Sequence, residues 1–209
     1  MAQDYGFPVT AILRIPLPEP EQMTPDQLAI HSAVVKGPRG RMVGPLRAVV
    51  HSPELADRWQ QFGEFVRYRT VLPEDLKELA ILVCGRHWNS DVEWAVHRRA
   101  GEKAGLSTDI LAAIEAAGPV VFARIEEREV YEFSRLLLGH GQVPDAEYGA
   151  IRSRWGDRGV VELTAIVGYY SMVALMVNAH LVPVPAEDGP GIRPLGPNRT
   201  ELAQSELRP

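Results

Sequence analysis

The chain has only one cysteine among its 209 residues and no excess of basic side chains. A single cysteine, Cys84, excludes a disulfide framework and fits a reducing compartment, so a cytoplasmic location is expected. Lysine and arginine number 22 against 27 acidic residues, which gives a net charge of −5 and no basic stripe for nucleic acid. Residues 1–20 lack a basic segment followed by an apolar one, so no secretory signal is expected.

The sequence also lacks the alternation of apolar and polar residues that marks a strand. Its apolar residues recur at helical intervals throughout, which predicts an all-α fold. Proline is frequent at both ends and excludes long helices there. We therefore expect an extended arm over 1–25, one helical domain over 26–182, and a Pro/Gly-rich tail over 183–209. The tail is expected to be either disordered or wrapped over another subunit. Within the domain, one core face is predicted to consist of Leu55, Trp59, Phe62 and Val66.

Only one long apolar run exists, over 160–182, and its length would allow it to cross a membrane. It contains Glu162 and Asn178 among other polar residues, and unpaired polar groups are costly in lipid. The run is therefore interpreted as a buried or interface helix, with no membrane association. Residues 162–168 can also be laid over 78–84 without a gap. This suggests a degenerate internal repeat, unless two apolar helices match by chance.

The stretch over 73–105 holds most of the groups able to do chemistry. It is predicted to form two helices, the first starting at Pro73 and the second ending at the left-handed cap Gly105. Short polar residues separate them, and Ser90 followed three residues later by Glu93 is a capping-box pattern. The first helix is apolar on nearly every side, so we expect it to be buried.

Three titratable residues in this stretch could transfer protons. Glu93 and His97 are four apart, so they share one face of the second helix, where the carboxylate could orient the imidazole. Glu78 lies on the preceding helix, where a dry carboxylate needs a partner or a shifted pKa. A purely structural reading also stands. In that reading Glu93 caps the helix, His97 is a core histidine, and Glu78 pairs with Arg98 or Lys77.

The pattern of Glu78, Ser90, Glu93 and His97, followed by Ala-Gly-Leu-Ser over 104–107, resembles the core of the carboxymuconolactone decarboxylase and AhpD-like family. The resemblance covers about residues 40–185. It implies an all-helical fold that assembles as a homo-oligomer (a dimer, trimer or hexamer), with tails that often bridge subunits. The peroxidase branch carries a Cys-x-x-Cys pair, but here Ser90 and Glu93 occupy the two cysteine positions. Without two thiols no intramolecular disulfide can form, so AhpD-type peroxide reduction is not expected.

The decarboxylase branch performs proton chemistry on a lactone and needs no cysteine pair. By resemblance, we expect a cofactor-independent enzyme that acts on a small carboxylated or cyclic metabolite. His97 would be the general acid/base, oriented by Glu93, with Glu78 as a second proton-handling group or a partner of the other ring nitrogen. An arginine would take the substrate carboxylate, with aromatic side chains as an apolar wall. The candidate substrate-binding residues are Arg67, Trp88, Ser90, Trp94 and Tyr169, with Arg41 and Arg47 as alternatives that are more typical of solvated charges.

Other functions remain open at this stage. The chain could be a catalytically inactive oligomeric protein that binds a small molecule, because a fold does not fix a function. Cys84 could act as a single-cysteine peroxidase, although burial in an apolar helix raises a thiol pKa and lowers its reactivity. His87, Glu93 and His97 could gather a divalent ion, but Glu-x-x-x-His alone is a weak signal. We expect no metal.

Overall fold

The computed structural model describes residues 12–195 and 200–208, and these form an all-α domain, as predicted. The parts of the predicted arms at 1–11, 196–199 and 209 lie outside the described residues. In chain order the elements are η1 (Pro20–Gln22), α1 (Pro25–Lys36), α2 (Gly44–Val49), α3 (Pro53–Tyr68), α4 (Glu74–His87), α5 (Asp91–Ala104), α6 (Thr108–Glu115), β1 (Val121–Phe122), α7 (Ile125–His140), α8 (Asp145–His180), η2 (Ala186–Asp188) and β2 (Glu206–Leu207).

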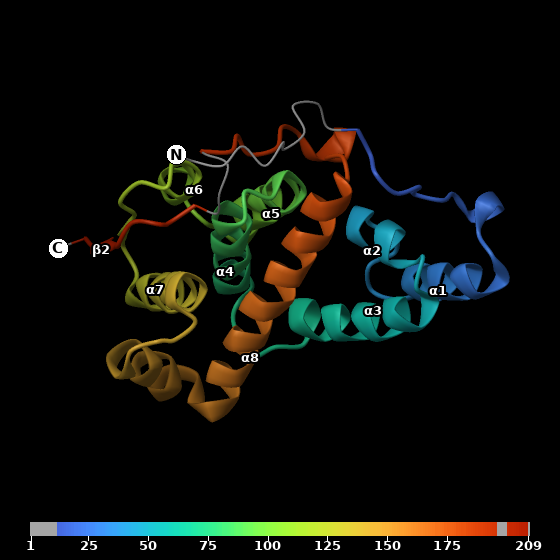
Figure 1. Ribbon diagram of the computed structural model, residues 1–209. Coiled ribbons are helices and arrows are strands. Elements are labelled where there is room, and N and C mark those ends of the chain that lie inside the picture. The colour runs from blue at the N-terminus through green and yellow to red at the C-terminus, as the bar shows by residue number, and fades with distance from the viewer. Residues whose placement is uncertain (1–11, 196–199, 209) are drawn as a thin grey trace.

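Helix α4 is the centre of the domain and packs against α5, α7 and α8. Every residue from Leu76 to His87 is buried, as its apolar composition predicts. Figure 1 shows α8 crossing the molecule diagonally, with α4 and α5 on one side and α2 and α3 on the other. This arrangement brings α3, α5 and α8 together.

Several helix ends form as the sequence indicates. Thr24 Oγ1 accepts a hydrogen bond from the Gln27 amide and Gln27 Oε1 accepts one from the Thr24 amide, which completes a capping box at the start of α1. Gly105 ends α5 with φ 103°, in the left-handed region that favours glycine. Helix α4 begins at Glu74, one residue later than predicted, with Pro73 just before it.

The predicted core face of α3 is wrong in part. Trp59 and Val66 are buried, but Leu55 and Phe62 are 47% and 43% exposed. The inward stripe of α3 follows Ala56, Trp59, Gly63 and Val66, so the predicted stripe is turned by part of a helical turn from the buried one and shares only Trp59 and Val66 with it. The small residues Ala56 and Gly63 gave no apolar signal for the inner face.

The apolar run is the second part of α8, which bends at Gly156 where φ is 69°. Among the described helices, only α8 is long and apolar enough to cross a membrane by length and composition. Buried core helices pass the same test, and Leu163, Ile166 and Ala174 are buried in the chain's own core. Glu162 accepts hydrogen bonds from the Val71 amide and from Arg158. The proposed repeat of 78–84 in 162–168 stays a prediction.

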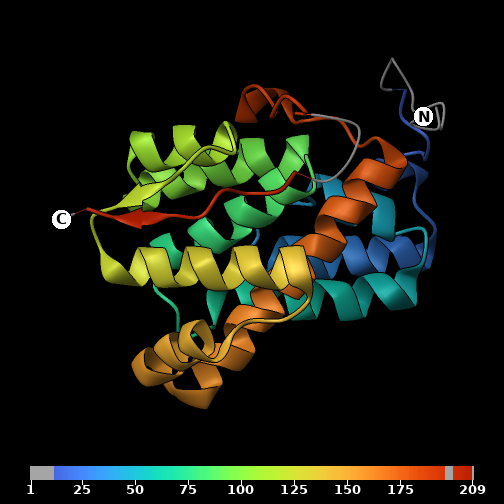
Figure 2. The same cartoon turned by 60° about the vertical axis from the view of Figure 1, so that its left-hand side comes forward.

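The predicted contact of the C-terminal tail with another subunit stays a prediction. The described part of the tail packs on its own chain, where the Thr200 amide donates to the His87 carbonyl at 2.7 Å. Ser205 donates from both its amide and its hydroxyl to Glu132 Oε1, each at 2.7 Å. Figure 2 shows the tail passing in front of α4 and running beside α7 to reach β1. There β2 pairs with β1 in parallel, a short strand pair that the helical periodicity did not predict.

Candidate active site

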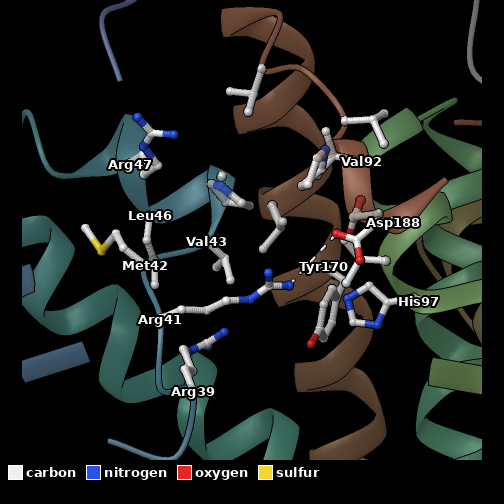
Figure 3. A pocket seen from close by; sticks show the side chains of 18 of the residues that line it. Arg39, Arg41, Met42, Val43, Leu46, Arg47, Val92, His97, Tyr170 and Asp188 are labelled. Carbon is white, nitrogen blue, oxygen red and sulfur yellow. Dashed lines mark ion pairs between the residues drawn. The ribbon is translucent and has the colours of Figure 1, made fainter. Parts of the chain in front are cut away.

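A cavity of about 420 Å³ opens between the loop after α1, helices α2, α3, α5 and α8, and the segment that follows α8. Its walls combine apolar residues such as Val43, Val92 and Val173 with a group of arginines and tyrosines. Figure 3 shows Arg41 and Arg39 reaching into it from the loop before α2, opposite His97 and Tyr170. Concave, mainly apolar spaces with a few convergent polar groups are typical of small-molecule sites.

At the α4–α5 contact, Glu78 and His97 form a buried pair. His97 Nδ1 lies 2.7 Å from Glu78 Oε2, and the two residues are 6% and 1% exposed. An ionised carboxylate can only accept, so Nδ1 carries the proton of this hydrogen bond. Nε2 then has a free lone pair, and it makes no hydrogen bond to any residue that the structure describes. His97 lines the cavity, and Glu78 lies behind it.

Arg67, at the end of α3, joins the same cluster. Its Nη1 lies 3.3 Å from Glu78 Oε1, 3.2 Å from His97 Nδ1 and 3.5 Å from the Tyr170 hydroxyl. The proton on Nδ1 already points to Glu78, so Arg67 donates to Glu78 rather than to the ring. The ring of Tyr170 stands edge-on to His97, with centroids 5.0 Å apart. Glu78, Arg67 and Tyr170 thus fix the imidazole on three sides.

The pKa directions agree with a charged Glu78 and a neutral His97. Burial alone would raise the pKa of Glu78, but His97, Arg67 and Lys77 together hold it below its ordinary value. Burial lowers the pKa of His97, and the charges of Arg67 and Arg39 lower it further against the opposing effect of Glu78. At neutral pH the ring is therefore a free base whose Nε2 can accept a proton.

Glu93 does not orient His97, contrary to the sequence-based expectation. Its carboxylate lines the cavity one turn away, and neither oxygen has a hydrogen-bond partner of good geometry among the described residues. The partner of His97 comes from α4 because the crossing of α4 and α5 brings Glu78 onto Nδ1. Burial raises the pKa of Glu93 well above its ordinary value, and only the Ser90 hydroxyl favours its charged form.

The predicted substrate-binding residues are divided by the structure. Arg67 and Tyr169 line the cavity, whereas Trp88, Ser90 and Trp94 do not. Trp94 is 1% exposed and packs in the hydrophobic core, and the ring of Trp88 stands edge-on to His87. Ser90 is the N-cap of α5, but its hydroxyl makes no capping hydrogen bond.

Sequence reasoning missed Arg39 in the cavity wall. It offered Tyr169 or Tyr170 for the wall and chose Tyr169, whereas both tyrosines line the cavity. Both do so because α8 passes between α3 and α5 and is covered on two sides. Arg39 lies in a loop with glycine and proline around it, which gave no signal of burial.

Cys84 is fully buried in α4, and its thiol donates weakly to the Val167 carbonyl at 3.7 Å. Burial raises the pKa of Cys84 well above its ordinary value, and nearby Glu93 adds to this effect. The thiol is outside the cavity lining. In the part of the chain that the structure describes, no group of three or more His, Cys, Asp or Glu side chains is placed to hold a metal ion.

Solved structures with a similar fold include two peroxidase-related proteins. One is an uncharacterized protein from Silicibacter sp. TM1040, with a TM-score of 0.67 and 13% identity over 84% of this chain and 93% of that one. The other, from Ralstonia eutropha JMP134, has an alkylhydroperoxidase AhpD core. Its TM-score is 0.69, with 13% identity over 85% of this chain and 94% of that one. A third is a variant of the debrominase Bmp8 in complex with 2,3,4-tribromopyrrole. It has a TM-score of 0.59 and 10% identity over 78% of this chain and 88% of that one.

No protein-family model and no curated protein sequence matches the chain. At 10–13% identity the structural likeness shows the fold, which is AhpD-like. The predicted fold is thus confirmed.

Proposed function

We propose that the protein is an enzyme of general acid/base chemistry, similar to the carboxymuconolactone decarboxylases, that acts on a small carboxylated or cyclic metabolite. One observation carries the proposal: a neutral imidazole, held at Nδ1 by a buried carboxylate, faces a cavity, and its second nitrogen has no hydrogen-bond partner among the described residues. Proton abstraction needs a base that is held in one tautomer and whose pKa is tuned by its neighbours. The chemistry requires no thiol pair and no cofactor.

In the proposed reaction His97 Nε2 removes a proton from the carbon that lies between a carbonyl group and a C=C bond of the substrate. The electron pair of the broken C–H bond moves toward the carbonyl oxygen and gives a dienolate. Glu93, neutral and lining the same cavity, donates its proton to the far carbon of that dienolate, so the double bond shifts by one position. Proton return from the imidazolium to Glu93 through cavity water restores the enzyme, so the net reaction is an isomerisation.

The cavity also suits a decarboxylation, in which Glu93 is the proton donor and His97 removes no proton. There the C–C bond to the carboxylate carbon breaks, CO₂ leaves, and the electron pair of that bond moves onto a neighbouring carbonyl group of the substrate. The proton of Glu93 takes the place of the lost CO₂, and solvent reprotonates Glu93. Arg67 keeps Glu78 ionised in this scheme, and Tyr170 holds the ring plane.

Hydrogen–deuterium exchange in D₂O tests the proposal without knowledge of the product. A panel of small carboxylates and lactones is incubated with the protein, and ¹H NMR follows the loss of signals from carbons next to a carbonyl. Wild type should catalyse the exchange of at least one panel member. His97→Asn should lower that rate by about 10²-fold or more, in line with the contribution of a general base.

Cys84→Ser is the matched control, because Cys84 lies outside the cavity lining. It should exchange the same compound at the wild-type rate. Exchange that persists in His97→Asn would refute the role of His97. Peroxide consumption that disappears in Cys84→Ser would show a single-cysteine peroxidase instead. Saturable binding of a panel member without exchange or turnover would favour an inactive binding protein.

A further inference from the structure

The cavity wall contains four arginines that differ in their ion-pair partners: Arg39, Arg41, Arg47 and Arg67. Arg41 lies 2.7 Å from Glu187 Oε1, and Arg47 lies 2.6 Å from Glu19 Oε1. Arg67 is paired with Glu78. Within residues 12–195 and 200–208, Arg39 alone among the four has no carboxylate partner. A partly buried cation without a counterion is costly, so a ligand that brings a negative charge would gain most at Arg39.

The nitrogen atoms of Arg39 lie in a polar corner of the wall. Its Nε and Nη2 are buried and meet no acceptor of good hydrogen-bond geometry among the described residues, and the same holds for Trp59 Nε1. The Tyr169 hydroxyl is the group beside both side chains, and burial raises its pKa to about 12 while Arg39 and Trp59 oppose that rise. Two donor side chains, Arg39 and Trp59, thus lie beside one neutral hydroxyl.

Gly63 makes this corner sterically accessible to Arg39. A Cβ at position 63 would lie 2.5 Å from Arg39 Nη2 and 2.0 Å from the Tyr169 hydroxyl, so any side chain there would displace both. Helix α3 therefore carries glycine where the guanidinium and the phenol meet its backbone. The Nε and Nη2 atoms form one edge of the guanidinium, and two N–H groups on one edge match the two oxygens of a carboxylate.

We propose that Arg39, with Trp59 and Tyr169 beside it, binds the carboxylate of the ligand and selects a small organic acid with an apolar or cyclic body. The carboxylate accepts from the guanidinium edge in place of the Tyr169 hydroxyl. The body of the acid then lies along the apolar wall toward His97. Arg67, the arginine that the sequence favoured for this role, already donates to Glu78. The inference rests on the proposed function only in that both use the same cavity.

Matched acids and amides test the carboxylate site by calorimetry. The probes are benzoate with benzamide, and 5-oxotetrahydrofuran-2-carboxylate with its amide. Wild type should bind at least one acid and bind its amide much more weakly. Arg39→Gln should weaken the binding of the acid by about tenfold or more and remove the preference over the amide, since a charged hydrogen bond is lost.

Arg41→Gln is the control for overall charge, because it removes the same charge from an arginine that Glu187 neutralises. It should change the affinity for the acid by a few-fold at most. Arg39→Lys keeps the charge but loses the pair of N–H groups that can bind both carboxylate oxygens, so it should bind the acid with intermediate affinity. This variant also controls for a folding defect in Arg39→Gln. Equal losses in Arg39→Gln and Arg41→Gln, or no acid binding to wild type at millimolar concentration, would overturn the inference.

His97→Asn separates this inference from the proposed reaction. It should keep the preference for acid over amide, because the imidazole makes its contacts with Glu78, Arg67 and Tyr170. Acid binding that survives in His97→Asn without deuterium exchange supports both proposals. Exchange that requires His97 but is indifferent to Arg39 supports the reaction and refutes the carboxylate site.

Discussion

Two buried polar clusters each include one residue of helix α5, and they differ in one respect, the presence of partners. The ion-paired cluster is Glu78, His97 and Arg67, and the unpaired cluster is Ser90 and Glu93. The two glutamates are equally buried, at 1% and 2% exposure, yet their pKa values move in opposite directions. Burial alone therefore does not decide the charge of a carboxyl group here, and the neighbouring cations do.

The two clusters therefore have different roles in the proposed site. The ion-paired cluster has fixed charges and presents a base, whereas the unpaired cluster presents a neutral acid. Pairs of titratable groups whose surroundings separate their pKa values are how one cavity can hold a proton acceptor and a proton donor at the same pH.

The largest expected effect comes from breaking the ion-paired cluster with Glu78→Ala. The change leaves Arg67 partly buried without its carboxylate, and removal of one partner of a buried pair costs about 3–5 kcal/mol of unfolding free energy. Denaturant unfolding at neutral pH measures it. The folded pKa of Glu78 is lowered, so its stabilisation exists above the unfolded pKa and is lost as pH falls through the folded pKa. The deficit of the variant should therefore shrink in acid.

Glu102→Ala is the control for this comparison. Glu102 also pairs with an arginine, Arg98, but on the surface, where both side chains are more than a third exposed. Such pairs contribute about 1 kcal/mol or less. Similar losses in Glu78→Ala and Glu102→Ala would mean that the cluster is not held by its charges.

The second-largest effect is expected from Glu93→Gln in the unpaired cluster, when its stability is compared with that of wild type across pH. The folded pKa of Glu93 is raised, so its contribution to stability is fully present below the unfolded pKa and is lost as pH rises through the folded pKa. Glutamine stays neutral, so the variant should gain on wild type by about 1.4 kcal/mol per pH unit across that window. Melting temperatures from pH 4 to 8 give the comparison. Parallel pH curves would show that Glu93 is not neutral in the folded protein.

The smallest effect is expected from Ser90→Ala. The hydroxyl is fully buried and makes no hydrogen bond of good geometry to the described residues, so its removal takes away only the support that it gives to the charged form of Glu93. We expect a change of about 1 kcal/mol or less in unfolding free energy, of either sign. A loss comparable with that of Glu78→Ala, measured in the same denaturant, would mean that Ser90 holds the structure and is wrongly grouped with the unpaired residues.

Much of the fold was predictable because its signals are local. The cap at Thr24 and the left-handed Gly105 follow from residues within one turn of the helix end, and the buried character of α4 follows from its composition. The chemistry-bearing residues Glu78 and His97 could be found for the same reason.

The pairing among these residues was not predictable. Spacing on one helix pointed to Glu93 as the partner of His97, but the crossing of α4 and α5 gives that place to Glu78. The role of Arg39 depends on which arginines find a carboxylate elsewhere, and Glu187, which neutralises Arg41, is 146 residues away in the chain. Contacts of this range are fixed only by the tertiary structure.

The cavity draws its walls from Leu17 at one end of the chain to Asp188 near the other. This has a consequence for folding kinetics, since contacts between distant residues form late and are slow to close. The central helices can associate early, but the ligand-binding surface exists only once the N-terminal arm, α3, α5 and the segment after α8 have all docked. Binding of a small acid should therefore be the last property to return during refolding, after the helical circular-dichroism signal has recovered.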